Sequence, residues 1–366
     1  MFKVFISASS LERMCLDEMD KEKNKQSSWF MILSKQNVIY LDRNIWDEWL
    51  SKGDDYLAEP LYQFSLSNDI EFRTSNTDFN KTNVDNSSVF LKEPQGALLL
   101  DVDKETAESI QKKYGIICQS TDSLTTCPLA QEEVKFSLRD NEITCSWQDI
   151  FAGMKQVPSN TLIIVDRYIF SYERIDDDRQ STCIDGLKNI QNILMSALPE
   201  ELSCDYHVLI MFDSGSVDHK FEMVKFAQAL EFIKNKVLKR PYKIIIELYS
   251  ITSKCDHYRC THNRKIISNY YKAEAPHMFK AFSATGEAFC TENIRIDSAY
   301  TFGLHKDGED ATIIEIQNDL DDLRKLHQAA ISYIRGKSDK ADEYDAICNA
   351  DDNSDVPDIR NRLIVV

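Results

Sequence analysis

Apolar runs of strand length alternate with helical periodicity through the middle of the chain. Residues 161–165, 206–212 and 242–251 are largely apolar and predict buried strands. Helices between them are indicated by apolar residues that recur every three or four positions: Leu187, Ile190, Leu194, Leu198, Phe226, Leu230, Ile233 and Val237. This order favours a parallel sheet covered by helices, in which ligands bind beyond the carboxyl ends of the strands.

The preceding part of the chain alternates less regularly. The expected strands are residues 3–7, 37–42, 97–102 and 116–119, and the expected helices are residues 28–35, 43–51 and 103–114. Gly115 directly follows the last of these helices and is typical of a helix end.

Turn-forming residues at 157–160 mark a boundary before the strand at 161–165. A long amphipathic helix with an acidic outer face is predicted at 312–335, and a polar, acidic tail follows it. We therefore expect an α/β chain in two parts. Residues 1–155 form an α/β domain of unknown role, residues 156–305 a second α/β domain, and residues 306–366 a C-terminal helix and tail.

Composition fits an ordinary globular protein. A hydrophobic share of 43% over 366 residues is enough for one large or two ordinary domains. The start of the chain lacks a signal-peptide pattern, and no apolar run approaches the roughly 20 residues of a membrane span. Ten scattered cysteines are typical of reduced thiols. We expect a soluble, cytoplasmic protein.

The net charge of −17 opposes binding to nucleic acid, unless the charge is distributed unevenly. Between Lys220 and Lys280 the chain has 13 Lys and Arg against 5 Asp and Glu, a local charge of +8. This is either a solvated surface or a positive funnel for a phosphate-bearing partner.

Residues 255–269, within this basic region, combine histidine, cysteine and basic side chains. On a strand, His262 and Arg264 point to one face, Lys265 points to the other, and Asn269 needs a bulge or the strand end to join them. A guanidinium binds phosphate oxygens as a planar fork, and histidine can act as a nucleophile or proton donor near neutral pH. The pattern favours phosphate chemistry.

The spacing His262-x-Arg264-x4-Asn269 resembles the H-x-K-x4-D signature of the phospholipase D superfamily, with Arg in place of Lys and Asn in place of Asp. Val165-Asp166-Arg167-Tyr168 is similar to the strand that ends near "D-P-Y" in that superfamily. The run from His262 to Asn269 also resembles the "H-D-R-x-I" element of the phospholipase D-like C-terminal domain of MIT proteins, which is thought to bind membranes. The resemblance covers roughly residues 160–290.

The resemblance implies a phospholipase D-like mixed or parallel sheet with flanking helices. It also implies a metal-independent phosphodiesterase or nuclease that acts on nucleic acid, with His262 as nucleophile, Arg264 as phosphate clamp and Asn269 as orienter. Only one motif is visible, so the second histidine would come from a homodimer. Bacterial proteins of this combined type often resemble defence effectors.

A second anion-binding element is expected between the strand at 206–212 and the following helix. Ser214, Ser216 and His219 lie there, and Lys265 is a further candidate for phosphate contact. The backbone N–H groups at a helix start can hold an anion, although the same sequence also suits a turn and a helix cap.

Three alternatives remain open. The site could grip phosphates or a membrane headgroup without cleaving them, with a membrane surface as the less favoured partner. Cys255, His257 and Cys260 offer zinc ligands beside His262, at a spacing unusual for zinc. Asp42, Asp101 and Asp103 follow strands and would suit Mg²⁺, and Ile39 to Asn44 resembles the "Y-L-D-x-N" of PIN-type ribonucleases.

Overall fold

The computed structural model describes residues 3–19, 27–34, 38–43, 47–48, 51–53, 62–64, 66, 70–75, 77, 79, 82, 84–124, 126–171, 185–213, 220–251, 258–283, 285–302, 311–336, 347–349 and 359–365. The chain is α/β and separates into two compact units, Met1–Ala130 and Gln131–Val366, called here the smaller and the larger unit.

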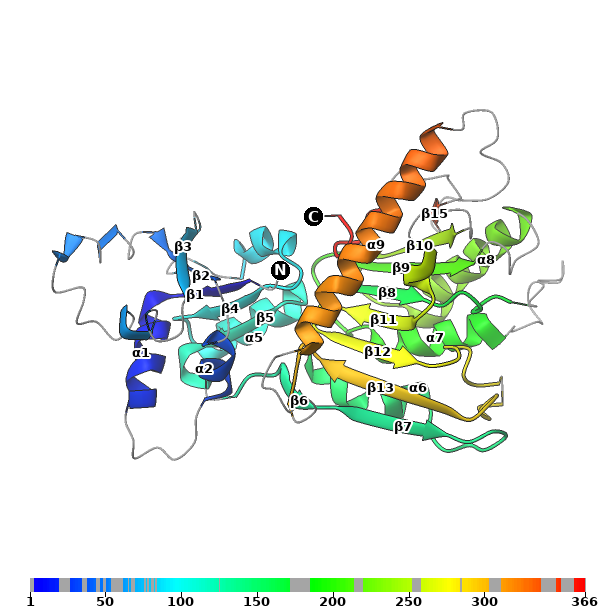
Figure 1. Ribbon diagram of the computed structural model, residues 1–366, viewed down its shortest axis with the longest axis horizontal. Helices are drawn as coiled ribbons and strands as arrows, with labels where there is room; N and C mark the ends of the chain where they lie inside the picture. Colours follow the sequence, from blue (N-terminus) through cyan, green and yellow to red (C-terminus); the bar gives the residue numbers. More distant parts are fainter. Residues whose placement is uncertain are drawn as a thin grey trace. The chain divides into compact units, whose positions relative to one another are not determined.

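The smaller unit is built on a five-stranded parallel sheet with the strand order β3-β2-β1-β4-β5 (Figure 1). The strands are β1 (Val4–Ile6), β2 (Val38–Asp42), β3 (Glu71–Ser75), β4 (Ala97–Leu100) and β5 (Ile117–Ser120). The helices are α1 (Ala8–Met19), α2 (Ser28–Leu33) and α5 (Lys104–Tyr114), with the 3-10 turns η3 (Ser87–Lys92) and η4 (Thr121–Ser123). Among these elements, the strand β3, the helix α1 and the two 3-10 turns were not expected from the sequence. The helix expected at 43–51 lies partly outside the described residues.

Local sequence explains where α5 begins and ends. The Asp103 side chain accepts a hydrogen bond from the Thr106 N–H at the start, and Gly115 adopts the left-handed conformation at the end. Between these caps, Ala107, Ile110 and Tyr114 are buried on one helical face. The predicted helix at 103–114 is confirmed.

The larger unit contains an eight-stranded mixed sheet with the order β15-β10-β9-β8-β11-β12-β13-β7 (Figure 1). The three central strands β10, β9 and β8 are parallel, and every other pairing is antiparallel. Its strands are β7 (Val134–Leu138), β8 (Thr161–Val165), β9 (Tyr206–Asp213), β10 (Ile244–Ile251), β11 (Arg264–Ser268), β12 (Tyr271–Ala275), β13 (Glu292–Ser298) and β15 (Ile347–Asn349). A separate pair is formed by β6 (Ala130–Glu132) and β14 (Tyr300–Phe302).

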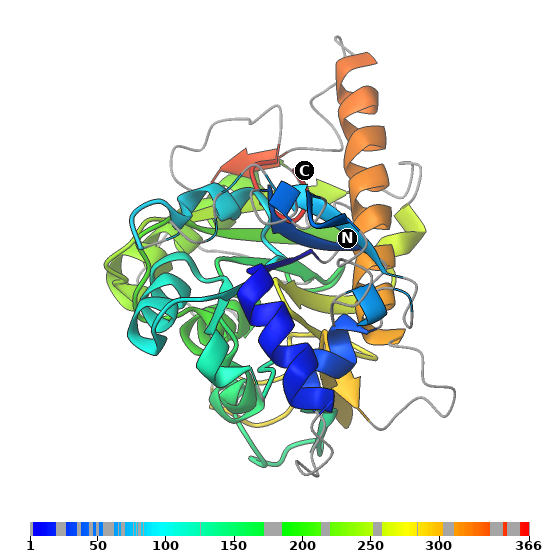
Figure 2. The same ribbon diagram turned by 90° about the vertical axis from the view of Figure 1, so that its left-hand side faces the viewer.

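Helices cover both faces of the larger sheet. The helices are α6 (Trp147–Ile150), η5 (Ala152–Gln156), α7 (Asp185–Ala197), α8 (Lys220–Phe232), η7 (Ile233–Leu238), η8 (Tyr258–Thr261) and α9 (Ala311–Gly336). Figure 1 shows α9 crossing the front of the sheet, with α6 and α7 behind it. In Figure 2, as in Figure 1, the far end of α9 extends beyond the sheet.

The helix α9 belongs to the core of the larger unit. Its buried residues Ile316, Leu320, Leu323 and Leu326 are all 0% exposed, and they pack on residues of β8 to β11 and on Ile359, Leu363 and Ile364. Burial of each such side chain contributes about 1.5–3 kcal/mol. None of the described helices combines the length and apolar composition that a bilayer crossing needs.

The division of the chain differs from the expected one. The boundary falls after residue 130 rather than near residue 155, because β7 pairs with β13 and completes the larger sheet. The residues expected as a separate C-terminal part also pack on that sheet, through α9 and the segment 359–365. The pairing of β7 with β13 joins residues more than 150 positions apart, which local patterns do not reveal.

Candidate functional site

The carboxyl ends of β8 and β9 and the amino end of β11 lie at one edge of the larger sheet, called here the open edge. Asp166 directly follows β8, and its N–H donates to the Met211 carbonyl of β9 at 3.0 Å. The antiparallel register pairs Lys265 with Val165, so Arg264 occupies the position opposite Asp166. The topology therefore brings residues from two separated sequence motifs together.

Asp166 is fully buried at the base of this edge. Its Oδ1 accepts a hydrogen bond from the Tyr168 N–H at 2.9 Å, and its Oδ2 accepts one from the Phe279 N–H at 2.6 Å. Burial raises the pKa of the Asp166 carboxyl to about 6, although these two N–H groups and the charge of Arg264 act in the opposite direction. The side chain fixes the chain segments on both sides of the edge.

Arg264 is half-buried, and two contacts position its guanidinium. Its guanidinium carbon lies 5.2 Å from the centre of the Tyr168 ring, and its Nη1 donates to the Pro276 carbonyl at 3.2 Å. Its Nε is shielded from solvent and has no hydrogen-bond partner among the described residues. Because Arg264 is only half-buried, an oxyanion could contact its remaining guanidinium N–H groups.

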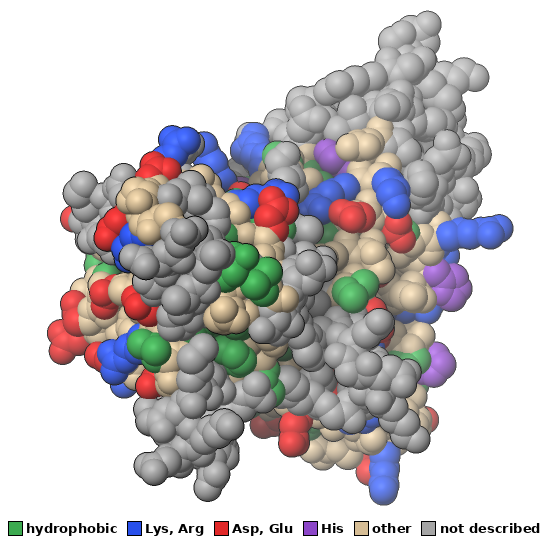
Figure 3. Space-filling model, turned by 60° about the vertical axis from the view of Figure 1, so that its left-hand side comes forward, with side chains coloured by type: hydrophobic (Ala, Val, Ile, Leu, Met, Phe, Trp, Pro, Cys, Tyr) green, Lys and Arg blue, Asp and Glu red, His purple; other side chains and the backbone are tan. Residues whose placement is uncertain are grey.

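His262 lies just before β11 rather than on it, in a bend whose N–H donates to the Arg259 carbonyl at 3.0 Å. Its side chain is exposed, whereas the neighbouring Thr261 is buried and accepts a hydrogen bond from Arg167 Nε at 2.9 Å. The His262 imidazole is therefore accessible, while hydrogen bonds of His262 and Thr261 restrain the backbone that carries it. Histidine side chains, and Lys and Arg side chains near them, reach the surface at the right of Figure 3.

His277 was missed in the sequence. The β11–β12 register ends with the pair Arg264 and Ala275, and His262 and His277 lie in bends two positions beyond these residues. The His277 side chain is exposed, and its N–H donates to Glu292 Oε2 at 2.9 Å. The sequence could have pointed to His277 only if the hairpin turn had been placed at 269–270. Counting outwards from that turn along both strands leads to the end of the hairpin near His262 and His277.

Asn269 does not join this group. It lies in the turn between β11 and β12, and its Oδ1 accepts hydrogen bonds from the N–H groups of Asn160 at 3.0 Å and Thr161 at 3.2 Å. Its Nδ2 donates to Asn160 Oδ1 at 3.0 Å. Five residues of strand separate it from Arg264 by about 16 Å. The structure gives Asn269 a role in joining strands and places it out of reach of His262.

Lys265 points away from the open-edge group, to the face covered by α9. Its side chain is 3% exposed and pairs with Asp319. Lys272 of β12 pairs with the same carboxylate at 3.3 Å and with Glu315 at 3.2 Å. Both lysines are therefore neutralised by an acidic helix that lies far away in the sequence.

Most of the remaining candidate residues in the basic region lie in segments that the structure does not describe. Ser214, Ser216, His219, Cys255 and His257 lie outside the described residues. Cys260 packs against the α9 core, and burial raises the pKa of its thiol to about 11. Within the described ranges, no group of three or more His, Cys, Asp or Glu side chains is arranged to hold a metal ion.

The three acids of the smaller unit are engaged in local hydrogen bonds. Asp42 is buried and accepts from the Phe79 N–H at 2.8 Å, while Asp101 accepts from Ser9 Oγ at 3.0 Å. Asp103 caps α5, and its hydrogen bonds to Thr106 lower the pKa of the Asp103 carboxyl. These acids hold turns and helix starts at the carboxyl edge of the smaller sheet.

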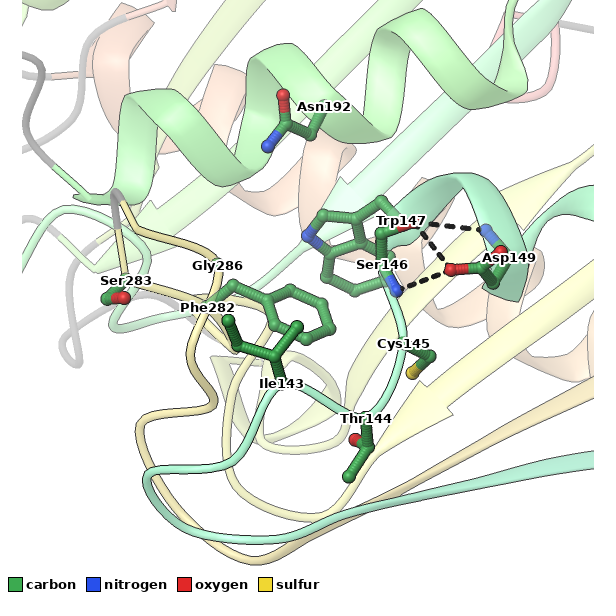
Figure 4. A pocket seen from close by; sticks show the side chains of 10 residues that line it. All are labelled: Ile143, Thr144, Cys145, Ser146, Trp147, Asp149, Asn192, Phe282, Ser283 and Gly286. Carbon is green, nitrogen blue, oxygen red and sulfur yellow. Dashed lines mark hydrogen bonds between the residues drawn. The ribbon is translucent and has the colours of Figure 1, made fainter.

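A pocket of about 310 Å³ lies between α6, α7 and the segment around residue 283 (Figure 4). Trp147 and Phe282 supply apolar walls, and Asp149 is the one charged residue that lines it. The Asp149 carboxylate accepts hydrogen bonds from the Ser146 N–H and hydroxyl at 2.8 and 2.7 Å. With no cation among its lining residues, this pocket does not suit a phosphate.

No protein-family model matches the chain, and no curated protein matches it in sequence. The assignment of a function therefore depends on the geometry of the open edge.

Proposed function

We propose that the larger unit binds a phosphodiester of nucleic acid at the open edge and cleaves it without a metal ion, as a phospholipase D-like phosphodiesterase. The order of elements supports this fold assignment. Three parallel strands, β8, β9 and β10, precede an antiparallel hairpin that begins with the His262–Arg264 motif. The resemblance implies a mixed or parallel sheet with flanking helices, and the mixed sheet of the larger unit is compatible with it.

One observation carries the proposal. His262 is exposed two residues before Arg264, whose half-buried guanidinium lies over the Tyr168 ring and donates to the Pro276 carbonyl. Arg264 binds two oxygens of the phosphodiester, and His262 attacks the phosphorus. Asp166 orders the backbone of both Tyr168 and Phe279 and thereby supports the site.

The second candidate function is binding without cleavage. In the described part of the chain, no carboxylate forms a hydrogen bond with the His262 ring, so nothing there fixes its tautomer. That observation favours a module that holds phosphodiesters through Arg264 alone.

Cleavage of labelled single- and double-stranded DNA and RNA, with and without EDTA, separates these functions. We expect EDTA-resistant cleavage that falls about a thousandfold in His262→Ala and stays unchanged in Asn263→Ala, an exposed neighbour. Salt-sensitive binding without cleavage, lost in Arg264→Ala but kept in Arg259→Ala, would support the binding module. Cleavage that EDTA abolishes and Asp42→Ala removes would move the activity to the smaller unit.

A further inference from the structure

We propose that the pocket between α6, α7 and the segment around residue 283 binds a small organic cation, namely an amine that carries an aromatic or other apolar group. The pocket volume of about 310 Å³ lies at the lower end of the range of ligand pockets, roughly 300–1,000 Å³. Because one water molecule occupies about 30 Å³ in the liquid, this volume suits a ligand of about ten non-hydrogen atoms. The proposal does not depend on cleavage at the open edge.

Asn189 of α7 fixes the apolar walls of this pocket. Its Oδ1 accepts hydrogen bonds from Trp147 Nε1 at 2.8 Å and from the Phe282 N–H at 3.1 Å. Its Nδ2 donates to the carbonyls of Phe282 at 2.7 Å and Asp185 at 2.8 Å. The buried amide thus uses all its donors and acceptors, and the Trp147 and Phe282 rings meet edge to face with centroids 5.6 Å apart. The walls are preformed, so a ligand does not have to order them.

Asp149 gives the pocket a negative charge. Both hydrogen bonds from Ser146 go to its Oδ2, so acceptor positions of the carboxylate remain for a ligand. These bonds, the one from the hydroxyl first, lower the pKa of the Asp149 carboxyl, which is therefore ionised at neutral pH. Among the described residues that line the pocket, none is Lys, Arg or His. The pocket therefore attracts a cation and repels an anion.

The other lining groups favour a ligand with a polar end and an apolar body. The Asn192 side chain of α7 makes no hydrogen bond in the part of the chain that the structure describes, so its Oδ1 can accept one from an ammonium group. Burial raises the pKa of the Cys145 thiol, and the Asp149 charge contributes in the same direction, so the thiol is neutral. Ile143 is 72% exposed and offers an apolar contact to the ligand.

Alkylation of Cys145 measures occupancy of the pocket, because its thiol lines the cavity. The intact protein is treated with N-ethylmaleimide, and modification is followed by peptide mass spectrometry, with half-buried Cys204 outside the pocket as the internal control. Phenethylamine, phenethyl alcohol and phenylacetate are compared, because they share a phenyl group and differ in charge. We expect phenethylamine to protect Cys145 with a midpoint of about a millimolar. The alcohol should need two- to fivefold more, phenylacetate should protect least, and Cys204 should react equally throughout.

Variants assign the selection of a cation to Asp149. Asp149→Asn should raise the midpoint for phenethylamine about two- to fivefold and leave that for phenethyl alcohol unchanged, because only the attraction between charges is lost. Asp140→Asn, at an exposed acid that does not line the pocket, is the matched control and should change neither midpoint. Ile143→Ser should weaken binding of both ligands about two- to threefold, because apolar contact is lost.

Equal midpoints for the amine, the alcohol and the acid would overturn the selection of a cation, and so would an Asp149→Asn variant that binds phenethylamine as tightly as the wild type. No protection of Cys145 by phenethylamine at about 50 mM would overturn the site itself. The comparison of ligands on the wild type decides even where a variant lowers the melting temperature. These measurements use no oligonucleotide, so this site and the proposed function can each fail without the other.

Discussion

The two ends of the β11–β12 hairpin carry polar residues for opposite purposes. At the turn, Asn269 is 1% exposed, and three hydrogen bonds tie it to the start of β8. At the open end, His262 and His277 are exposed, and Arg264 is half-buried. A polar side chain whose hydrogen bonds are used within the fold stabilises it, whereas one that is held but unsaturated can bind a ligand.

The segment 359–365 also has a polar side chain whose hydrogen bonds are used within the fold, at the end of the sheet where β8 and β9 begin. Asn361 is fully buried, where its Oδ1 accepts from Thr161 Oγ1 at 3.0 Å and its Nδ2 donates to the Leu162 carbonyl at 3.1 Å. The segment covers the part of the sheet near the starts of β8 and β9. This end of the sheet is therefore closed by the chain itself, and the predictions below test the closed end against the open edge.

The largest effect is expected at the turn. Asn269→Ala removes the acceptor of two buried backbone N–H groups, each of which costs about 1–3 kcal/mol when left without a partner. We expect a loss of about 3–5 kcal/mol in the free energy of unfolding, measured by urea denaturation, and no specific loss of cleavage per folded molecule. His262→Ala should show the reverse, with a change in stability below about 0.5 kcal/mol.

Asn269→Asp is the matched variant, because the family motif has Asp at this position. The acid keeps the two acceptor contacts but loses the donor to Asn160 Oδ1. We expect lower stability and no gain in cleavage rate. A higher cleavage rate in Asn269→Asp would show that the residue at the turn affects the chemistry at His262. That result would contradict the separation of roles between the two ends of the hairpin.

The next effect concerns Glu247 on β10, which is 0% exposed. Its Oε1 accepts from the Arg360 N–H at 2.7 Å, while its Oε2 has no partner. Burial raises the pKa of the Glu247 carboxyl from 4.5 to about 7. The folded state therefore binds the proton more tightly, so this contribution to stability is complete below pH 4.5 and is lost as the pH rises through about 7.

Glu247→Gln should therefore be about 1 kcal/mol less stable than the wild type below pH 4.5, because of the new buried amide group, and about 2 kcal/mol more stable at pH 8. The change of about 3 kcal/mol between these two differences is what the shift of the Glu247 pKa is worth. Urea unfolding between pH 4 and pH 8 measures this difference, with Glu201→Gln as the exposed control. An advantage that is equal at every pH would show that the carboxyl does not titrate in this range.

His207 provides an opposing trend in the same place, because its Nδ1 lies 2.7 Å from the Arg360 carbonyl. Burial lowers the pKa of the His207 ring from 6.5 to about 4. Its contribution to stability is complete above pH 6.5 and is lost as the pH falls towards 4. Between about pH 4.5 and 6.5, the two groups change the free energy of unfolding in opposite directions as the pH rises. In Glu247→Gln the contribution of Glu247 is removed, so stability should rise with pH over this range because of His207.

A smaller effect on stability is expected for Lys265, which stands next to Arg264 but faces α9. Lys265→Met leaves Asp319 with Lys272 as its remaining partner, so we expect a loss of about 1–2 kcal/mol. Affinity for a labelled oligonucleotide should stay within about twofold, whereas Arg264→Met should weaken it tenfold or more. Equal losses of affinity in the two variants would place Lys265 in the binding site.

The sequence predicted most elements and only part of the site. Apolar runs located β8, β9 and β10, and the caps Asp103 and Gly115 located α5, because these signals are local. The pairing of Lys265 with Asp319 depends on α9 docking on the sheet, so the count of +8 overestimated the free positive charge. Asn269 was expected to join His262 and Arg264 through a bulge or the strand end, but it lies in the turn between β11 and β12, at the other end of β11.

The smallest effect is expected for Tyr168, the residue beneath the Arg264 guanidinium. Tyr168 is 41% exposed, and a cation–π contact at such a site is worth about 0.5–1 kcal/mol. Tyr168→Leu should therefore weaken oligonucleotide binding about two- to fivefold, while Tyr168→Phe should retain it, because the ring face persists. Phe289→Leu, at an aromatic residue that is 38% exposed, is the control and should change nothing. If Tyr168→Leu binds as tightly as the wild type, Pro276 and the backbone alone orient Arg264. A loss greater than tenfold would mean that the ring also contacts the nucleic acid.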